Sequence, residues 1–192
     1  MRNAVLPTLV LALTIALGGP ALARPVPYLL QPEESSVGFE TDFGPDLISG
    51  AMPVKSADLI LDFDSVANSR IDVTLDVTNA QASFPFAAQA MKGPKVLDAQ
   101  GFPEMSFHST AIRRDGDGAR VEGALTIRGV TRPVTLQASI YRQKGTGAGD
   151  HRRLTVQLKG SVRRSDFGAT GWSDMVGDEV RLTILARIAQ AE

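Results

Sequence analysis

Side chains that could carry out acid–base or metal chemistry are few in this chain. His108 and His151 are its two histidines, and neither has a motif partner. Without cysteine, a disulfide, a thiolate nucleophile and a Cys-ligated zinc or iron–sulfur cluster are excluded. Two histidines cannot make a three-histidine zinc site, although two histidines with a carboxylate remain formally sufficient. We therefore expect no catalytic residue and no metal site.

The other candidates for ligand binding are two glycine-containing motifs and three arginine doublets. Residues 145–149 (GTGAG) lack the spacing and the strand-to-helix setting of a phosphate loop. Residues 115–118 (DGDG) suggest calcium, but the rest of an EF-hand loop is missing, so a hairpin turn is the better interpretation. Arginine doublets occur at 113–114, 152–153 and 163–164. Gathered at one end of the fold they would attract an anionic head group, with Arg163 and Arg164 as its contacts.

The overall composition is that of an ordinary globular domain and excludes several classes of protein. The 192 residues include 20 lysines and arginines against 21 aspartates and glutamates, and 43% are apolar. Disordered chains and polytopic membrane proteins have more extreme compositions. A nearly neutral chain lacks the basic excess that nucleic acid binding requires, so we expect no nucleic acid partner.

The first 23 residues have the features of a secretory signal peptide. Arg2 provides a positive start, an uncharged apolar run covers residues 4–17, and the small-residue sequence Ala-Leu-Ala ends at Ala23. The run is shorter than the roughly 20 residues that span a bilayer. We therefore expect cleavage after Ala23, a periplasmic location, and a mature domain of residues 24–192.

From residue 59 onward, apolar and polar residues alternate, which predicts half-buried β-strands. The last run, for example, has Val180, Leu182 and Ile184 on one face. Together with an earlier pair of strands near residues 37–43 and 47–54, these runs amount to about eight strands. Their short connections imply antiparallel neighbours. The pattern predicts an all-β sandwich or closed barrel.

One stretch, between Val77 and Met105, has no period of two. Residues 87–92 are strong helix formers, and Gly93 and Pro94 end them. We expect a long crossover with one or two short helices that covers an end or a groove of the barrel.

Alternation alone does not distinguish an outer-membrane barrel, which is apolar outside, from a soluble barrel, which is apolar inside. An outer-membrane barrel carries aromatic girdles, and the mature chain offers only Tyr28, Tyr141 and Trp172 as amphipathic aromatics. A soluble barrel is therefore favoured. About eight strands enclose either packed side chains or one small ligand, and the pattern leaves both interiors open.

Three motifs follow one another in the second half of the chain. They are FPEMSFHST at residues 102–110, GALTIRGVTRPV at 123–134, and RSDFG at 164–168. In this order they resemble the YceI-like family of lipid- and polyisoprenoid-binding proteins, and the similarity extends from about residue 28 to 188. The resemblance implies an extended, lipocalin-like antiparallel β-barrel of eight strands. It also implies a periplasmic or secreted protein that holds a long apolar chain, such as an isoprenoid quinone tail, in the lumen.

The chain departs from this family at two positions. Many members have His-Leu-Gly where this chain has residues 42–44 (DFG), and a histidine in the crossover where this chain has Met91. The first change could alter a contact near the mouth of the barrel. The identity of the ligand's head group is therefore not transferred.

The combined expectation is a non-enzymatic carrier that holds a long-chain isoprenoid or other lipid and uses no cofactor. An alternative is an accessory interaction or stress-response protein with a packed barrel and no stable ligand. A hydrolase with an unrecognised site is a third class. Transient membrane contact and a homodimer are compatible with these readings. The side chains expected to line the lumen are Phe39, Phe43, Phe63, Phe84, Phe86, Met91, Leu97, Phe107, Leu125, Leu136, Leu158 and Leu182.

Overall fold

The computed structural model describes residues 24–147 and 149–191. The expected signal peptide, residues 1–23, lies outside this part. Eleven strands form one sheet. They are β1 (Val26–Leu30), β2 (Ser36–Phe43), β3 (Asp46–Met52), β4 (Val54–Leu61), β5 (Arg70–Asp76), β6 (Gln81–Ala82), β7 (Glu104–Asp115), β8 (Gly118–Ile127), β9 (Val130–Arg142), β10 (Arg153–Arg163) and β11 (Val176–Gln190).

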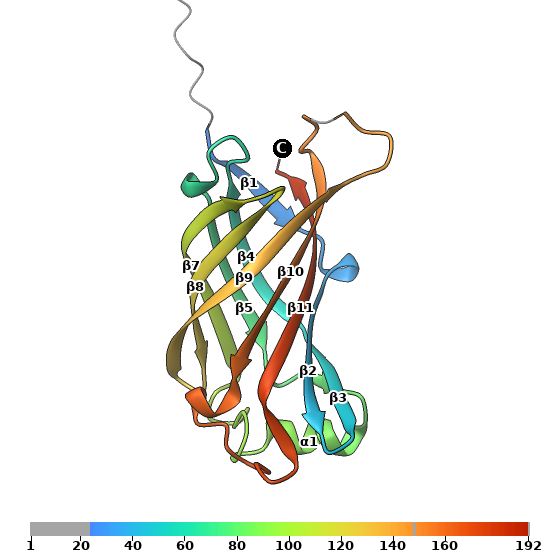
Figure 1. Ribbon diagram of the computed structural model, residues 1–192, viewed down its shortest axis with the longest axis vertical. Coiled ribbons are helices and arrows are strands. Elements are labelled where there is room, and N and C mark those ends of the chain that lie inside the picture. The colour runs from blue at the N-terminus through green and yellow to red at the C-terminus, as the bar shows by residue number, and fades with distance from the viewer. Residues whose placement is uncertain (1–23, 148, 192) are drawn as a thin grey trace, which may run out of the picture.

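Eight of these strands close into the antiparallel barrel that the sequence predicts (Figure 1). Their order is β1-β4-β5-β7-β8-β9-β10-β11, and β11 pairs back with β1. The expected hairpin turn at 115–118 joins β7 to β8. Between β8 and β9, Arg128 and Gly129 both have positive φ, which is the backbone of a type I′ hairpin turn. The lipocalin-like fold class is therefore confirmed.

The remaining strands extend one end of the barrel. The 15-residue strand β11 pairs near its C-terminal end with β1, and along the rest of its length with β2. β2 and β3 form a hairpin, and the two-residue strand β6 pairs with β3. Pro53 separates β3 from β4, because proline has no N–H to donate to a ladder. The sequence pattern indicated neither β1 nor β6.

Strict alternation of burial identifies the inner face of the barrel. In β9, Val134, Leu136 and Ala138 are buried, while Thr135 and Gln137 between them are exposed. Successive side chains of a strand point to opposite faces, so the buried set faces the lumen. The apolar face therefore points inward, as expected for a soluble barrel.

The long crossover carries a single α-helix, α1 (Pro85–Lys92), which lies at the end of the barrel formed by the β2–β3 hairpin (Figure 1). Pro85 occupies the first turn, where its missing N–H costs no hydrogen bond, and Gly93 is the C-cap. Short 3₁₀ helices occur at η1 (Pro32–Glu34), η2 (Val66–Asn68) and η3 (Arg164–Phe167). Within the described residues, no helix has the length and apolar character needed to cross a membrane.

The opposite end of the barrel is filled by side chains. Tyr28, Leu59, Leu154 and Ile188 form a buried cluster there. The Tyr28 hydroxyl donates a hydrogen bond of 3.0 Å to the backbone oxygen of His151, and burial raises the pKa of this phenol. The Phe63 ring lies against Tyr28, edge to face, with ring centroids 5.7 Å apart. We call this the closed end.

A buried arginine fixes the loop between η3 and β11. The Arg164 guanidinium donates from Nε to the carbonyl of Gly177 and from Nη2 to that of Val176, at 2.8 and 2.9 Å. Its Nη1 donates to the carbonyls of Ala169 and Gly171, at 2.6 and 2.7 Å. The Asp178 carboxylate accepts hydrogen bonds from the amide and the hydroxyl of Ser165 in η3, at 2.9 and 2.8 Å.

We expect Arg164→Leu to destabilise the protein by about 3 kcal/mol, because it leaves several buried carbonyl oxygens without a donor. The exposed neighbour provides a matched control, and Arg163→Leu should change the free energy of unfolding by no more than about 0.5 kcal/mol. Urea denaturation of both variants measures the difference. Equal stabilities would contradict the structural role of Arg164.

Candidate ligand-binding site

A cavity of about 410 Å³ occupies the lumen. Its lining extends from Leu30 and Phe63, beside the closed end, to α1 and the loop between η3 and β11. The lining is almost entirely apolar and includes residues from all eight strands of the closed barrel, with Leu30 as the contribution of β1. The interior is therefore hollow rather than filled by side chains.

The structure brings all the sequence-predicted lumen residues to this cavity. Seven of them lie on β2 and on β7 to β11, and the crossover supplies four. Phe63 comes from the segment that follows β4. The predicted residues that line the cavity are Phe39, Phe43, Phe63, Phe84, Phe86, Met91, Leu97, Phe107, Leu125, Leu136, Leu158 and Leu182. Their contact with a ligand stays a prediction.

Several lining residues were not predicted. Ala87 and Ala90 reach the cavity from α1 together with Met91. Their spacing of three and four residues is the period of one helix face, so the sequence carried a signal for them. Ile48, on the β2–β3 hairpin, also lines the cavity. Its position depends on how the hairpin folds onto β11, for which the local sequence holds no signal.

The buried polar side chains in the lining are bonded to the protein itself. The Asp62 carboxylate accepts hydrogen bonds from the Ser65 and Asp64 amides, at 2.7 and 3.0 Å, and from the Asn68 side chain at 3.0 Å. The hydrogen bond from Asn68, and then that from Ser65, lowers the pKa of Asp62, so this carboxyl is ionised at neutral pH. Thr41 donates its hydroxyl hydrogen to backbone oxygens of β11, at 2.9 Å from Glu179. These groups offer a ligand little polar recognition.

The expectation that the arginine doublets gather at one mouth is wrong. Arg153 and Arg163 are the two ends of β10, so the doublets that contain them lie at opposite ends of the barrel. Arg163 is exposed and does not line the cavity. Arg164 does line it, but its guanidinium is bound to four carbonyl oxygens. The expected head-group pair is therefore not assembled.

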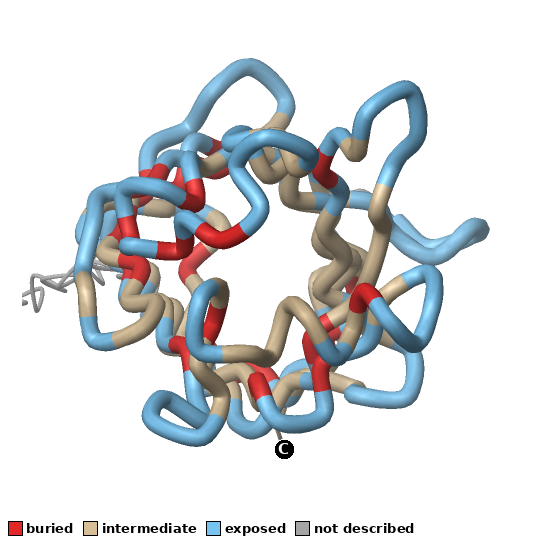
Figure 2. The backbone as a smooth tube through the Cα atoms, turned by 90° about the horizontal axis from the view of Figure 1, so that it is seen from below, coloured by how far each residue is buried: buried red, intermediate tan, exposed pale blue. Residues whose placement is uncertain are grey.

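The cavity opens at the α1 end. Phe84, Phe86, Trp172 and Met175 line it and are also exposed to solvent, Phe86 by 74% of its surface. Viewed from this end, the backbone encircles a central axis and its loops are largely exposed (Figure 2). The lining near the closed end contains none of the strongly exposed apolar side chains. The cavity is thus a sac with its mouth at α1.

Two phenylalanine rings lie against glycines on neighbouring strands. A Cβ atom at Gly50 would stand 2.3 Å from the Phe39 ring, and one at Gly123 would stand 2.4 Å from the Phe107 ring. Both rings line the cavity. The absent side chains let the rings lie against the wall, and this placement keeps the lumen open.

The histidines take no part in this site. His108 is exposed on the outer face, as its strand parity predicts, with its Nδ1 paired to the Asp72 carboxylate. The His151 ring stacks on Phe63 at the closed end, with ring centroids 4.6 Å apart. In the described part of the chain, no group of three or more potential ligands is arranged to hold a metal ion.

We expect Gly123→Ala to destabilise the fold by about 1–3 kcal/mol and to push the Phe107 ring into the lumen, because the new methyl group also meets the His108 carbonyl. Gly147→Ala is the control, since no atom lies within 4 Å of a Cβ placed there. Thermal unfolding and a crystal structure of the variant measure both effects. An unchanged Phe107 rotamer would contradict the proposed role of the glycine.

Comparison with known proteins gives relatives along most of the barrel. Residues 28–188 match the family model of the YceI-like domain. A UPF0312 protein of Yersinia pestis (strain Pestoides F) is 28% identical over 118 residues, which is 62% of this chain and 61% of the relative. Protein YceI of Salmonella arizonae is 28% identical over 115 residues, or 60% of each chain. These alignments span less than two thirds of the curated relatives.

Solved structures share the fold. BcnA of Burkholderia cenocepacia superposes with a TM-score of 0.75 at 23% identity, covering 83% of this chain and 99% of that protein. The Campylobacter jejuni YceI protein superposes with a TM-score of 0.60 at 18% identity, covering 100% of this chain and 99% of that protein. At these identities the likeness concerns architecture alone. The family model, in contrast, covers most of the sequence, and the chain therefore belongs to the YceI-like domain family.

Proposed function

We propose that this protein is a non-enzymatic carrier or reservoir for a polyisoprenoid or another long-chain lipid, held in the barrel lumen. The observation that carries the proposal is the cavity of about 410 Å³, which is almost entirely apolar and has exposed lining residues at the α1 end. Its volume falls within the roughly 300–1,000 Å³ that is usual for small-molecule pockets. Its shape suits an extended apolar chain.

Reversible burial of such a chain supplies enough free energy without a charged anchor. Each buried methylene group contributes about 0.8 kcal/mol before the costs of association. At about 0.3 kcal/mol per heavy atom for larger ligands, some 25 carbons give about −7.5 kcal/mol, which corresponds to near-micromolar affinity. An isoprenoid quinone is one ligand of this kind, and its head group would remain at the mouth, because the deeper polar groups are already bonded to the protein.

The proposed mechanism makes and breaks no covalent bond and uses no cofactor. The proposed location is the periplasm, on the strength of the signal peptide expected at residues 1–23. In that compartment a carrier shields an apolar chain from water between two membranes. The family resemblance supports binding as the function and is compatible with several ligands.

The test is solvent extraction and mass spectrometry of protein purified from the cells that make it. We expect close to one long-chain lipid per protein molecule. Leu158→Asp should remove it, because a carboxylate buried in the lumen is costly to desolvate. Lys159→Asp, on the neighbouring outward position, should retain it.

Circular dichroism establishes that both variants are folded. A folded Leu158→Asp variant with normal lipid content would contradict binding in the lumen. Wild-type protein that carries no lipid and takes none up from added polyprenol would contradict the carrier function as a whole.

A further inference from the structure

Exposed apolar side chains gather around the mouth of the cavity. Leu47 of the β2–β3 hairpin, Phe84 and Phe86 at the start of α1, and Trp172 and Met175 in the loop between η3 and β11 are all among the strongly exposed large apolar residues. We call these five residues the apolar rim. Isolated exposed apolar residues are common, but a group on one end of a molecule marks an interaction surface.

Backbone hydrogen bonds join the three segments of the apolar rim. The Gly44 amide in the hairpin turn donates to the carbonyl of Met175 at 3.2 Å, and the Gly171 amide donates to the carbonyl of Lys95 at 2.8 Å. Ser83, just before α1, donates its amide to the carbonyl of Ser49 in β3 at 2.7 Å. Arg164 additionally holds the loop that carries Trp172. The rim is therefore one fixed surface.

The apolar rim is continuous with the cavity. Phe84, Phe86, Trp172 and Met175 belong to both, while Leu47 belongs to the rim alone. A lipid that enters through this mouth must pass these side chains. If the rim faced water, the apolar chain would cross an aqueous layer on its way in, whereas a rim seated in a bilayer gives it a continuous apolar path.

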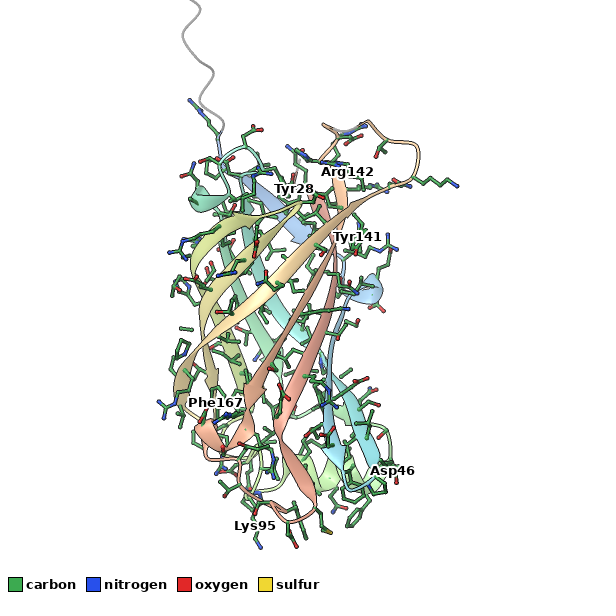
Figure 3. All side chains as sticks on the ribbon, in the orientation of Figure 1. Tyr28, Asp46, Lys95, Tyr141, Arg142 and Phe167 are labelled. Atoms are coloured by element: carbon green, nitrogen blue, oxygen red, sulfur yellow. The ribbon has the colours of Figure 1, made fainter. Side chains whose placement is uncertain are left out.

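The charges around the apolar rim identify the kind of bilayer. The Lys95 ammonium lies 5.9 Å from the centre of the Trp172 ring, an amphipathic pair of the type found at membrane interfaces. Lys92 lies at the end of α1, while Asp46 and Asp174 lie on the other two segments. Lys95 and Asp46 are both seen at this end in Figure 3. Arg128, which donates to the carbonyls of Pro94 and Gly168, adds a further charge at this end. Charges of both signs match a zwitterionic surface, which presents ammonium and phosphate groups together, better than a strongly charged partner.

We propose that the apolar rim docks reversibly on the surface of a zwitterionic phospholipid bilayer, with the cavity mouth facing the acyl chains. This step rests on the proposed carrier function and assigns the surface through which lipid is exchanged. Leu47, Phe86 and Trp172 enter the boundary between head groups and acyl chains, and the lysines remain among the phosphates.

The experiment measures binding to vesicles of phosphatidylcholine and phosphatidylethanolamine. The test variant is Leu47→Ser with Phe86→Ser. The matched control is Leu29→Ser with Tyr141→Ser, which removes side chains with exposed fractions of 62% and 54% from the opposite half of the barrel, against 51% and 74% for the test pair. All proteins are compared with the same N-terminus, determined by mass spectrometry.

We expect the test variant to lose at least about tenfold in vesicle partition and the control to lose less than about twofold. Trp172 is the chain's one tryptophan, so its fluorescence should shift to the blue on adding vesicles to wild type and control, and stay unshifted with the test variant. Replacing a third of the lipid by phosphatidylglycerol should change binding less than about threefold, because charges of both signs surround the rim.

Other outcomes overturn the proposal. Equal losses in both double variants, or no binding by wild type, would exclude docking through the rim. Sedimentation that shows a wild-type dimer and a monomeric test variant would assign the rim to a second copy of this chain. Lipid content after extraction separates failure of the docking proposal from failure of the carrier proposal. If wild type does not bind vesicles but the Leu47→Ser single variant still contains lipid, the docking proposal fails and the carrier function stands.

Discussion

Closure through β11 is the constraint on which the rest of the structure depends. On one edge β11 pairs with β10 from Arg153 to Arg163, and on its other edge it pairs with β1 and then with β2. These ladders hold β11 between its neighbours on both edges and turn every second side chain inward. A barrel of eight strands can be filled by side chains or can hold a small ligand. Here the Phe39 and Phe107 rings lie against Gly50 and Gly123, and the lumen is left open.

The two ends of the barrel are built in different ways. At the closed end, Tyr28 and Phe63 fill the bore with aromatic rings, and the Tyr28 hydroxyl finds a backbone acceptor. At the α1 end, the wall is built from loops whose carbonyl groups face inward and need donors. Arg164 supplies four of these hydrogen bonds from a single side chain. An arginine suits this place because its planar fork reaches several acceptors at once.

The period of two predicted the strands and which side chains share a face, because burial in β9 follows that period at every step from Val134 to Ala138. The choice of a barrel over a sandwich came from the resemblance to the YceI-like family, and the inward direction of the apolar face from the scarcity of amphipathic aromatic residues. It could not indicate β6, since two residues hold no period. The partners of Arg164 are backbone carbonyls, which every residue has, so the sequence could not indicate them. The separation of the arginine doublets could have been predicted from the sequence, because residues 153 and 163 begin and end one strand and must lie at opposite ends of it.

The cavity opens at the α1 end, so any water inside it must leave as a lipid enters there. A water molecule in a cavity needs two to four polar partners to remain there. In this lumen the polar groups of Asp62, Thr41 and Arg164 are already bonded to the protein, and every buried side-chain nitrogen and oxygen of the described residues has a partner. The lining therefore holds water poorly. In the proposed carrier, a lipid that enters through the α1 end therefore has little bound water to displace, and the same opening can serve for entry and exit.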